Sequence, residues 1–141
     1  MSVLPAQPAT LRQARSLVQQ WLADQDWPGE DAHDVVLAVH EAVANVVDHA
    51  YPRTVTGSVH LHAWVSVEPR TGARRVVATV TDRGCWRAEH GAAADLTSRG
   101  YGLVMMSGCM AEMHIQRSAS GTTVILISPT VPAGSPPAQL P

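Results

Sequence analysis

A strict two-residue alternation from Ser58 to Val67 limits what this chain can fold into more than any other pattern in it. Successive side chains of a strand point to opposite faces, so the alternation predicts a strand that is buried on one side only. The apolar side carries Val59, Leu61, Ala63, Val65 and Val67, and the other side carries His60, His62, Trp64 and Ser66. Such a strand requires a second layer of structure over its apolar side.

Three further strands are predicted. Residues 76–82 (VVATVTD) pair with the first strand as a hairpin, across the turn sequence EPRTGARR. Residues 112–118 (EMHIQRS) and 121–127 (GTTVILI) form a second hairpin around Ser120 and Gly121.

Two helices precede the strands and supply the second layer. Apolar residues recur at helical spacing over residues 10–24, with Thr10 as the cap, and a longer helix runs from about Asp31 to Ala50. Helices followed by antiparallel strands predict an α+β fold, a two-layer sandwich with the helices on one face of a mixed or antiparallel sheet.

The length of 141 residues indicates one domain, which we expect to span residues 1–128. Residues 129–141 (PTVPAGSPPAQLP) are rich in proline and small residues, so we expect a disordered tail there. Between the two hairpins lies the loop-like sequence RGCWRAEHGAAADLTSRG, followed by a short helix in YGLVMMSGCMAE.

Charge and composition exclude several classes of function. Ten Lys+Arg residues stand against twelve Asp+Glu, without a basic stripe, so nucleic acid is not an expected partner. No apolar run is long enough to span a membrane and the N-terminus lacks a signal-peptide layout, so we expect a cytoplasmic protein. Cys85 and Cys109 fit a reduced compartment and resemble neither a disulfide framework nor a metal site.

The longer helix carries an unusual line of polar residues. Its apolar stripe consists of Val35, Val36, Val39, Ala42, Val43, Val46, Val47 and Ala50. On the other side, Glu41 and Asn45 are one turn apart, with Asp34 and Asp48 further along the same line and His49 beside them. A solvated polar face has the same pattern, so this helix alone leaves both interpretations open.

Three short motifs follow in a fixed order. VTDRG places Asp82 and Gly84 at the end of a predicted strand. SRGYGL places Gly100 and Gly102 before a helix, where backbone N–H groups can bind an anion. GTTV places two hydroxyls at the start of the last strand.

In this order, the HEAVANVVDHAYP helix and the three motifs resemble the ATP-binding fold shared by gyrase, the Hsp90 chaperone, histidine kinases and the MutL repair protein. This is the Bergerat-type fold of the GHKL (HATPase_c) superfamily. The short chain and the wording of the helix are most similar to the bacterial anti-sigma factor serine kinases of the RsbW type. The resemblance extends from the first helix to Ile127.

The resemblance implies a set of ligand contacts. Asn45 matches the asparagine that binds Mg²⁺ through its amide oxygen, a ligand type that this ion accepts. Asp82 matches the carboxylate that accepts a hydrogen bond from the adenine amino group of ATP, with help from a threonine such as Thr123. Guanine has an oxygen at that position and would leave the carboxylate unpaired.

The remaining implied roles concern the phosphates and catalysis. Gly84, Gly100 and Gly102 match turns that line the base and phosphates, and Arg99 is placed to touch the terminal phosphate. Glu41 precedes the metal ligand by one helical turn, where a carboxylate can accept the proton of an attacking serine. In these kinases the serine belongs to an anti-anti-sigma protein, and the kinase also sequesters a sigma factor.

Departures from the family pattern leave alternatives open. Trp86 in DRGCW replaces the second glycine of the Asp-x-Gly-x-Gly pattern, which leaves room for a non-catalytic, nucleotide-gated binding module that captures a regulator. A histidine-kinase catalytic domain is a third reading, which a dimerisation or phosphoacceptor helix would favour. His40 and Glu41 do not form a zinc-protease signature, because Ala44 occupies the required second histidine position.

The outward side of the strand at residues 58–67 allows two further interpretations. His60 and His62 share one strand face and can hold a metal only with a third ligand, which the sequence does not indicate. With Trp64 beside them they form a candidate subunit or partner surface, so a homodimer is among the expected assemblies.

Overall fold

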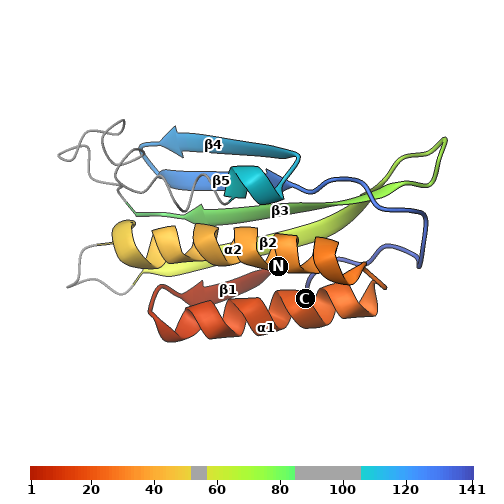
Figure 1. Cartoon of the computed structure of the whole chain (residues 1–141). Helices are drawn as coiled ribbons and strands as arrows, with labels where there is room; N and C mark the ends of the chain where they lie inside the picture. The colour runs from red at the N-terminus through yellow and green to blue at the C-terminus, as the bar shows by residue number, and fades with distance from the viewer. Residues whose placement is uncertain (52–56, 85–105) are drawn as a thin grey trace.

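An antiparallel sheet forms one layer of the molecule, and two helices lie across one of its faces (Figure 1). The computed structural model describes residues 1–51, 57–84 and 106–141. Within those residues the sheet has five strands in the order β1-β2-β3-β5-β4, and each neighbouring pair is antiparallel. The predicted α+β sandwich is therefore confirmed, with an antiparallel rather than a mixed sheet.

The two long helices and the four strands that the sequence predicts are present, with ends that shift by at most two residues. In chain order the elements are β1 (Ser2–Pro5), α1 (Ala9–Asp24), α2 (Gly29–His49), β2 (Ser58–Val67), β3 (Arg74–Asp82), β4 (Glu112–Ser118) and β5 (Gly121–Ile127). Strand β1 was not predicted, because four residues ending in proline are too few to show a period.

The core lies between α2 and the inner face of the sheet. Leu61, Val80 and Val124 stand in one row across β2, β3 and β5, and each is at most 2% exposed. The valine stripe of α2 covers this face, with Val39, Val43 and Val46 at most 2% exposed. Burying a side chain of this size stabilises the fold by about 1.5–3 kcal/mol. The sheet and α2 therefore depend on each other for burial.

The outer face of the sheet carries no helix among the described residues (Figure 1). Trp64 pairs with Val77 and Val77 with Ile127, so these side chains form one partly exposed apolar row. The His62 ring lies 4.8 Å from the Trp64 ring, measured between centroids. This face contains the strand surface that the alternation predicts.

Residues 129–141 differ from the disordered tail that their composition predicts. Val131 is 4% exposed and Leu140 is 2% exposed. Val131 exchanges two backbone hydrogen bonds with Arg74, at 2.8 and 2.9 Å, and the Leu140 N–H donates to the Ala63 carbonyl at 2.9 Å. The segment returns along the molecule and ends beside the N-terminus (Figure 1). Two apolar anchors and a buried arginine hold it, which a composition average does not reveal.

The predicted short helix near residue 106 is described only in part. Residues 106–109 are helical, and Met106 is fully buried. Cys109 lies against Asp34 of α2; burial raises the pKa of its thiol, and the neighbouring Asp34 carboxylate raises it further. Cys85 and Trp86 lie outside the described residues.

The described helices are too short or too polar to cross a lipid bilayer.

Gly121 supports a prediction about the sheet. Its φ is +140°, and an added Cβ would lie 1.9 Å from the Asp82 carbonyl oxygen. Gly121→Ala should lower the free energy of unfolding by at least about 2 kcal/mol, because both the backbone angle and the contact oppose a side chain. Chemical denaturation measures the change. Gly29→Ala is the control, because no atom lies within 4 Å of that added Cβ; equal loss in both variants would contradict the prediction.

Candidate functional site

The polar line on α2 is not simply a solvated helix face. Asn45 is only 8% exposed and Glu41, one turn earlier, is partly buried, whereas Asp48 is exposed. Among the described residues, no hydrogen bond to the Asn45 amide is found. Within the same part of the chain, Trp27 Nε1 and His40 Nδ1 are fully buried without a hydrogen-bond partner, but neither Asn45 amide atom shares that condition. The Asn45 amide is therefore accessible to a ligand, and its predicted contact with Mg²⁺ stays a prediction.

Asp82 ends β3 on the side that faces the helices. Its strand partners are Val59 and Thr122, and all three residues are at most 4% exposed. The Gly84 N–H donates to the Asp82 carboxylate at 3.0 Å. This bond holds the carboxylate at the point where the chain leaves the sheet.

Close packing at Gly84 brings the end of β3 to the end of α2. A Cβ added to Gly84 would lie 1.9 Å from the Ala50 carbonyl oxygen, so only glycine fits there. Asn45 precedes Ala50 by five residues, about 7.5 Å along a helix axis. The structure therefore places the buried carboxylate and the buried amide at the same end of the interface between helix and sheet.

The Tyr51 side chain stabilises this arrangement, a role that was not predicted from the sequence. Its hydroxyl donates to the Ser58 carbonyl at 2.6 Å and accepts from the Arg83 N–H at 2.9 Å. The side chain thereby joins the end of α2 to the start of β2 and the end of β3. An aromatic residue directly after the polar helix was the available signal.

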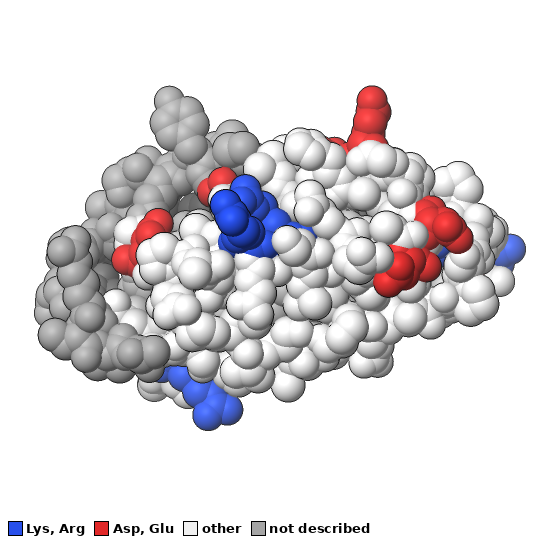
Figure 2. All heavy atoms as spheres, turned by 90° about the horizontal axis from the view of Figure 1, so that it is seen from below, with Lys and Arg blue, Asp and Glu red and all other residues white. Residues whose placement is uncertain are grey.

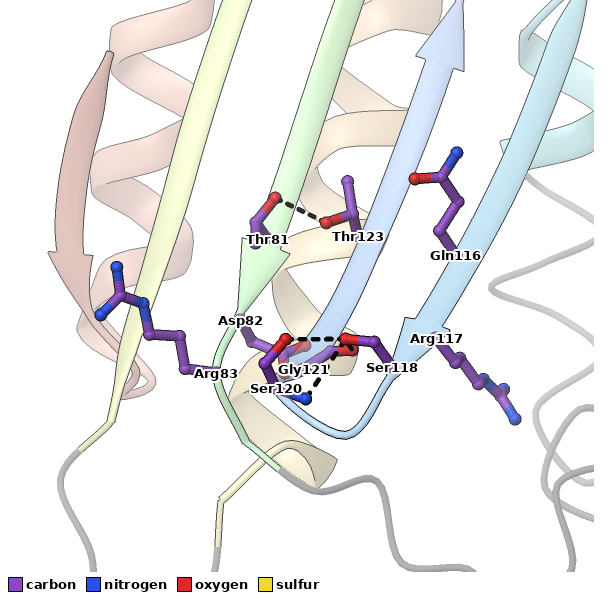
Figure 3. A pocket seen from close by; sticks show the side chains of 9 residues that line it. All are labelled: Thr81, Asp82, Arg83, Gln116, Arg117, Ser118, Ser120, Gly121 and Thr123. Atoms are coloured by element: carbon purple, nitrogen blue, oxygen red, sulfur yellow. Dashed lines mark hydrogen bonds between the residues drawn. The ribbon is translucent and has the colours of Figure 1, made fainter.

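Thr123 is not beside Asp82, so its predicted adenine contact is corrected. Its hydroxyl lies 3.0 Å from that of Thr81 on the outer face of the sheet, as Figure 3 shows. These two threonines line an open, polar cavity of about 640 Å³, together with Gln116, Ser118 and Ser120, and Asp82 also borders this cavity at the end of β3. Thr122, the strand partner of Asp82, occupies the inner face instead. A shift of one residue along a strand reverses the face, and the two adjacent threonines did not define which one points inward.

Three of the predicted phosphate-contacting residues cannot be placed. Arg99, Gly100 and Gly102 lie outside the described residues. Among the residues that are described, no group of three or more His, Cys, Asp or Glu side chains could hold a metal ion. The same is true of the described region around His60 and His62.

The surface charge is dispersed on the side shown in Figure 2. The view is from below Figure 1, and its basic and acidic residues form small separate groups between large uncharged areas. A phosphate backbone requires a continuous basic surface, which this side does not offer.

Comparison with known proteins places the fold in a family. Residues 4–128 match the model of the histidine kinase-like ATPase domain. The structure of the RsbU and RsbW domains of Rv1364c from Mycobacterium tuberculosis is 28% identical over 94% of this chain, with a TM-score of 0.64. This chain spans 34% of the length of that one.

Two structures of a blue-light activated histidine kinase from Erythrobacter litoralis are more distant. The histidine kinase domain is 23% identical over 86% of this chain, with a TM-score of 0.47, and this chain covers 59% of it. The longer structure has the same identity and coverage, with a TM-score of 0.48, and this chain covers 41% of it. Because the family model extends from β1 through β5, this chain belongs to the histidine kinase-like ATPase domain family, whose members are built to bind ATP.

Proposed function

We propose that this protein is an anti-sigma factor and a serine-protein kinase. It binds ATP with Mg²⁺, phosphorylates a serine of an anti-anti-sigma protein and sequesters a sigma factor, in the cytoplasm. The observation that carries the proposal is the pair on α2, Glu41 and Asn45, in which Asn45 is 8% exposed and its amide has no hydrogen-bond partner among the described residues. The likeness to a structure that contains an RsbW domain supports it.

Asp82 selects adenine in this proposal. A carboxylate that is 1% exposed accepts a hydrogen bond from the adenine amino group, and Thr122 contributes from the adjacent strand. A guanine oxygen at that position would face the carboxylate without a donor between them, a pairing that buried polar groups strongly disfavour.

Asn45 and Glu41 have different roles near the phosphates: Asn45 binds the metal ion and Glu41 accepts a proton. Asn45 holds Mg²⁺, and the ion when bound neutralises charge on the triphosphate oxygens. Glu41 accepts the proton of the serine hydroxyl as it attacks. Arg99, Gly100 and Gly102 contact the phosphates, and Gly84 keeps the end of β3 close to α2.

A second candidate is a nucleotide-gated binding module that captures a regulator without phosphorylating it. Trp86, which replaces a glycine of the family pattern, favours this candidate. The two functions share the nucleotide site and differ only in phosphoryl transfer, so catalytic variants separate them.

The first functional prediction concerns nucleotide selection. Asp82→Asn should weaken Mg²⁺-dependent ATP binding by about 1–3 kcal/mol, because the charged acceptor for the adenine amino group is lost. Calorimetry measures the affinity. Thr123→Val is a matched control, because its hydroxyl lies on the other face of the sheet and its loss should leave the affinity unchanged. Wild-type affinity in Asp82→Asn would refute the assignment.

The second prediction separates kinase from binding module. Glu41→Gln should keep ATP binding and reduce phosphoryl transfer by about 10²–10⁴-fold, because only the proton acceptor is removed. Asn45→Ala should lose Mg²⁺-dependent binding as well as transfer. Single-turnover assays with candidate anti-anti-sigma proteins give both quantities, and Asp48→Asn on the exposed side of α2 is the control. Unchanged transfer in Glu41→Gln rules out its catalytic role, and no transfer by the wild type favours the binding module.

The third prediction tests the proposed homodimer or partner surface on the outer face. Trp64→Ala should weaken self-association or partner capture and leave ATP affinity unchanged, because a large partly exposed aromatic side chain contributes to contacts on that face only. Analytical ultracentrifugation and partner titration measure the effect. Ser66→Ala, on the same strand face, serves as the control; identical behaviour of both variants argues against this surface.

A further inference from the structure

The C-terminal strap, residues 129–141, crosses a groove built around Arg74. The Arg74 side chain belongs to β3 but is 4% exposed. Its Nε donates to the Pro132 carbonyl at 2.9 Å, and its Nη1 donates to the Gln25 carbonyl at 2.7 Å. The guanidinium also lies 4.9 Å from the centre of the Trp27 ring. The arginine thus joins the strap to the end of α1.

The far end of the strap is bound in the same manner. The Trp21 indole N–H donates to the Ala138 carbonyl at 3.1 Å, and the Ala138 N–H donates to the Gln25 side-chain oxygen at 3.1 Å. Leu140 then pairs with the Ala63 carbonyl on β2. The groove therefore contacts the main chain of the strap and two apolar side chains, Val131 and Leu140, nine positions apart.

The strap itself has the chemistry of a peptide ligand. It contains no charged residue, and prolines 129, 132, 136, 137 and 141 restrict its backbone before it binds. Segments of this kind bind to aromatic surfaces at low entropic cost, and donors on the surface form hydrogen bonds with the carbonyl groups of the segment. Trp21 and Arg74 supply these features, and the Trp27 ring packs against the Arg74 guanidinium. Unfilled space of about 260 Å³ remains between the strap and α1, lined in part by Leu17 and Gln20.

We propose that Trp21, Gln25, Trp27 and Arg74 form a binding groove for an uncharged, proline-rich segment, which residues 129–141 occupy in cis. The family match ends at residue 128, so the occupant follows directly after the matched region. The groove is formed by the C-terminal end of α1 and the start of β3, whereas the nucleotide site lies at the end of β3. The proposal does not depend on the proposed kinase function.

A full-length variant with a weakened strap tests the groove. Val131→Asp combined with Leu140→Asp places charges where the two anchors are buried, and should open the strap while the groove residues stay unchanged. A synthetic peptide with the sequence of residues 128–141 should then bind saturably, measured by calorimetry and tryptophan fluorescence. The same peptide with aspartate at both anchor positions should not bind. Equal binding of both peptides, or no binding of the first at millimolar concentration, overturns the proposal.

Hydrogen exchange on the otherwise wild-type chain provides an independent test. Arg74→Met should accelerate exchange of the Val131, Ala138 and Leu140 amides about 10- to 100-fold, because charged hydrogen bonds to the strap and α1 are lost. Arg75→Met removes the same charge from the next residue of β3, which points to the outer face, and should leave these amides protected. Wild-type exchange in Arg74→Met, or simultaneous loss of protection throughout β3, would show that the groove does not hold the strap as a separate ligand.

Discussion

The packing of α2 on the inner face of the sheet is the interaction on which the rest of the structure depends. The valine stripe of the helix and the apolar rows of β2, β3 and β5 bury one another. Because α2 lies along the sheet, its C-terminal end meets the end of β3, where Gly84 touches the Ala50 carbonyl. The candidate site is a direct consequence of this contact. Any substitution that moves α2 would separate Asn45 from Asp82.

Apart from Thr10, which donates to the Pro5 carbonyl, the buried polar side chains among the described residues fall into two groups with different chemistry. Gln25, Arg74 and Ser128 are satisfied by backbone groups of the chain itself, and all three help to hold the C-terminal strap or the strand end before it. Asn45 lies near the end of α2, and Asp82 of β3 pairs with Thr122 of β5. Burial of such groups costs free energy unless they are paired. The first group contributes to folding, whereas the second lies where we propose that the nucleotide binds.

The proposed groove would be a second recognition surface in addition to the candidate nucleotide site. Its contacts are mostly to main-chain atoms, so they select an extended backbone rather than one side-chain sequence. Prolines lower the entropy that the segment loses when it binds. The groove and the nucleotide site lie toward opposite ends of β3, so one strand connects both.

The sequence by itself determined the elements and the identity of most candidate site residues. Alternation from Ser58 to Val67 and helical spacing in α2 are local patterns. Such patterns can be recognised in the sequence without knowledge of the fold. Asn45 and Asp82 could be named because their motifs follow one another in a family order. The role of Tyr51 could be assigned only from the tertiary structure, because its two hydrogen-bond partners lie at the ends of separate strands.

Tertiary structure alone decided which threonine faces inward and what becomes of residues 129–141. Thr122 and Thr123 are chemically identical neighbours, and the apolar residues that follow on both faces of β5 fit either register. Only pairing with β3 places Thr122 beside Asp82. Composition predicted disorder for the strap because it has few apolar residues. Two of them, Val131 and Leu140, are buried beside an arginine and tryptophans that come from distant parts of the chain. Long-range contacts of this kind leave no local sequence signal.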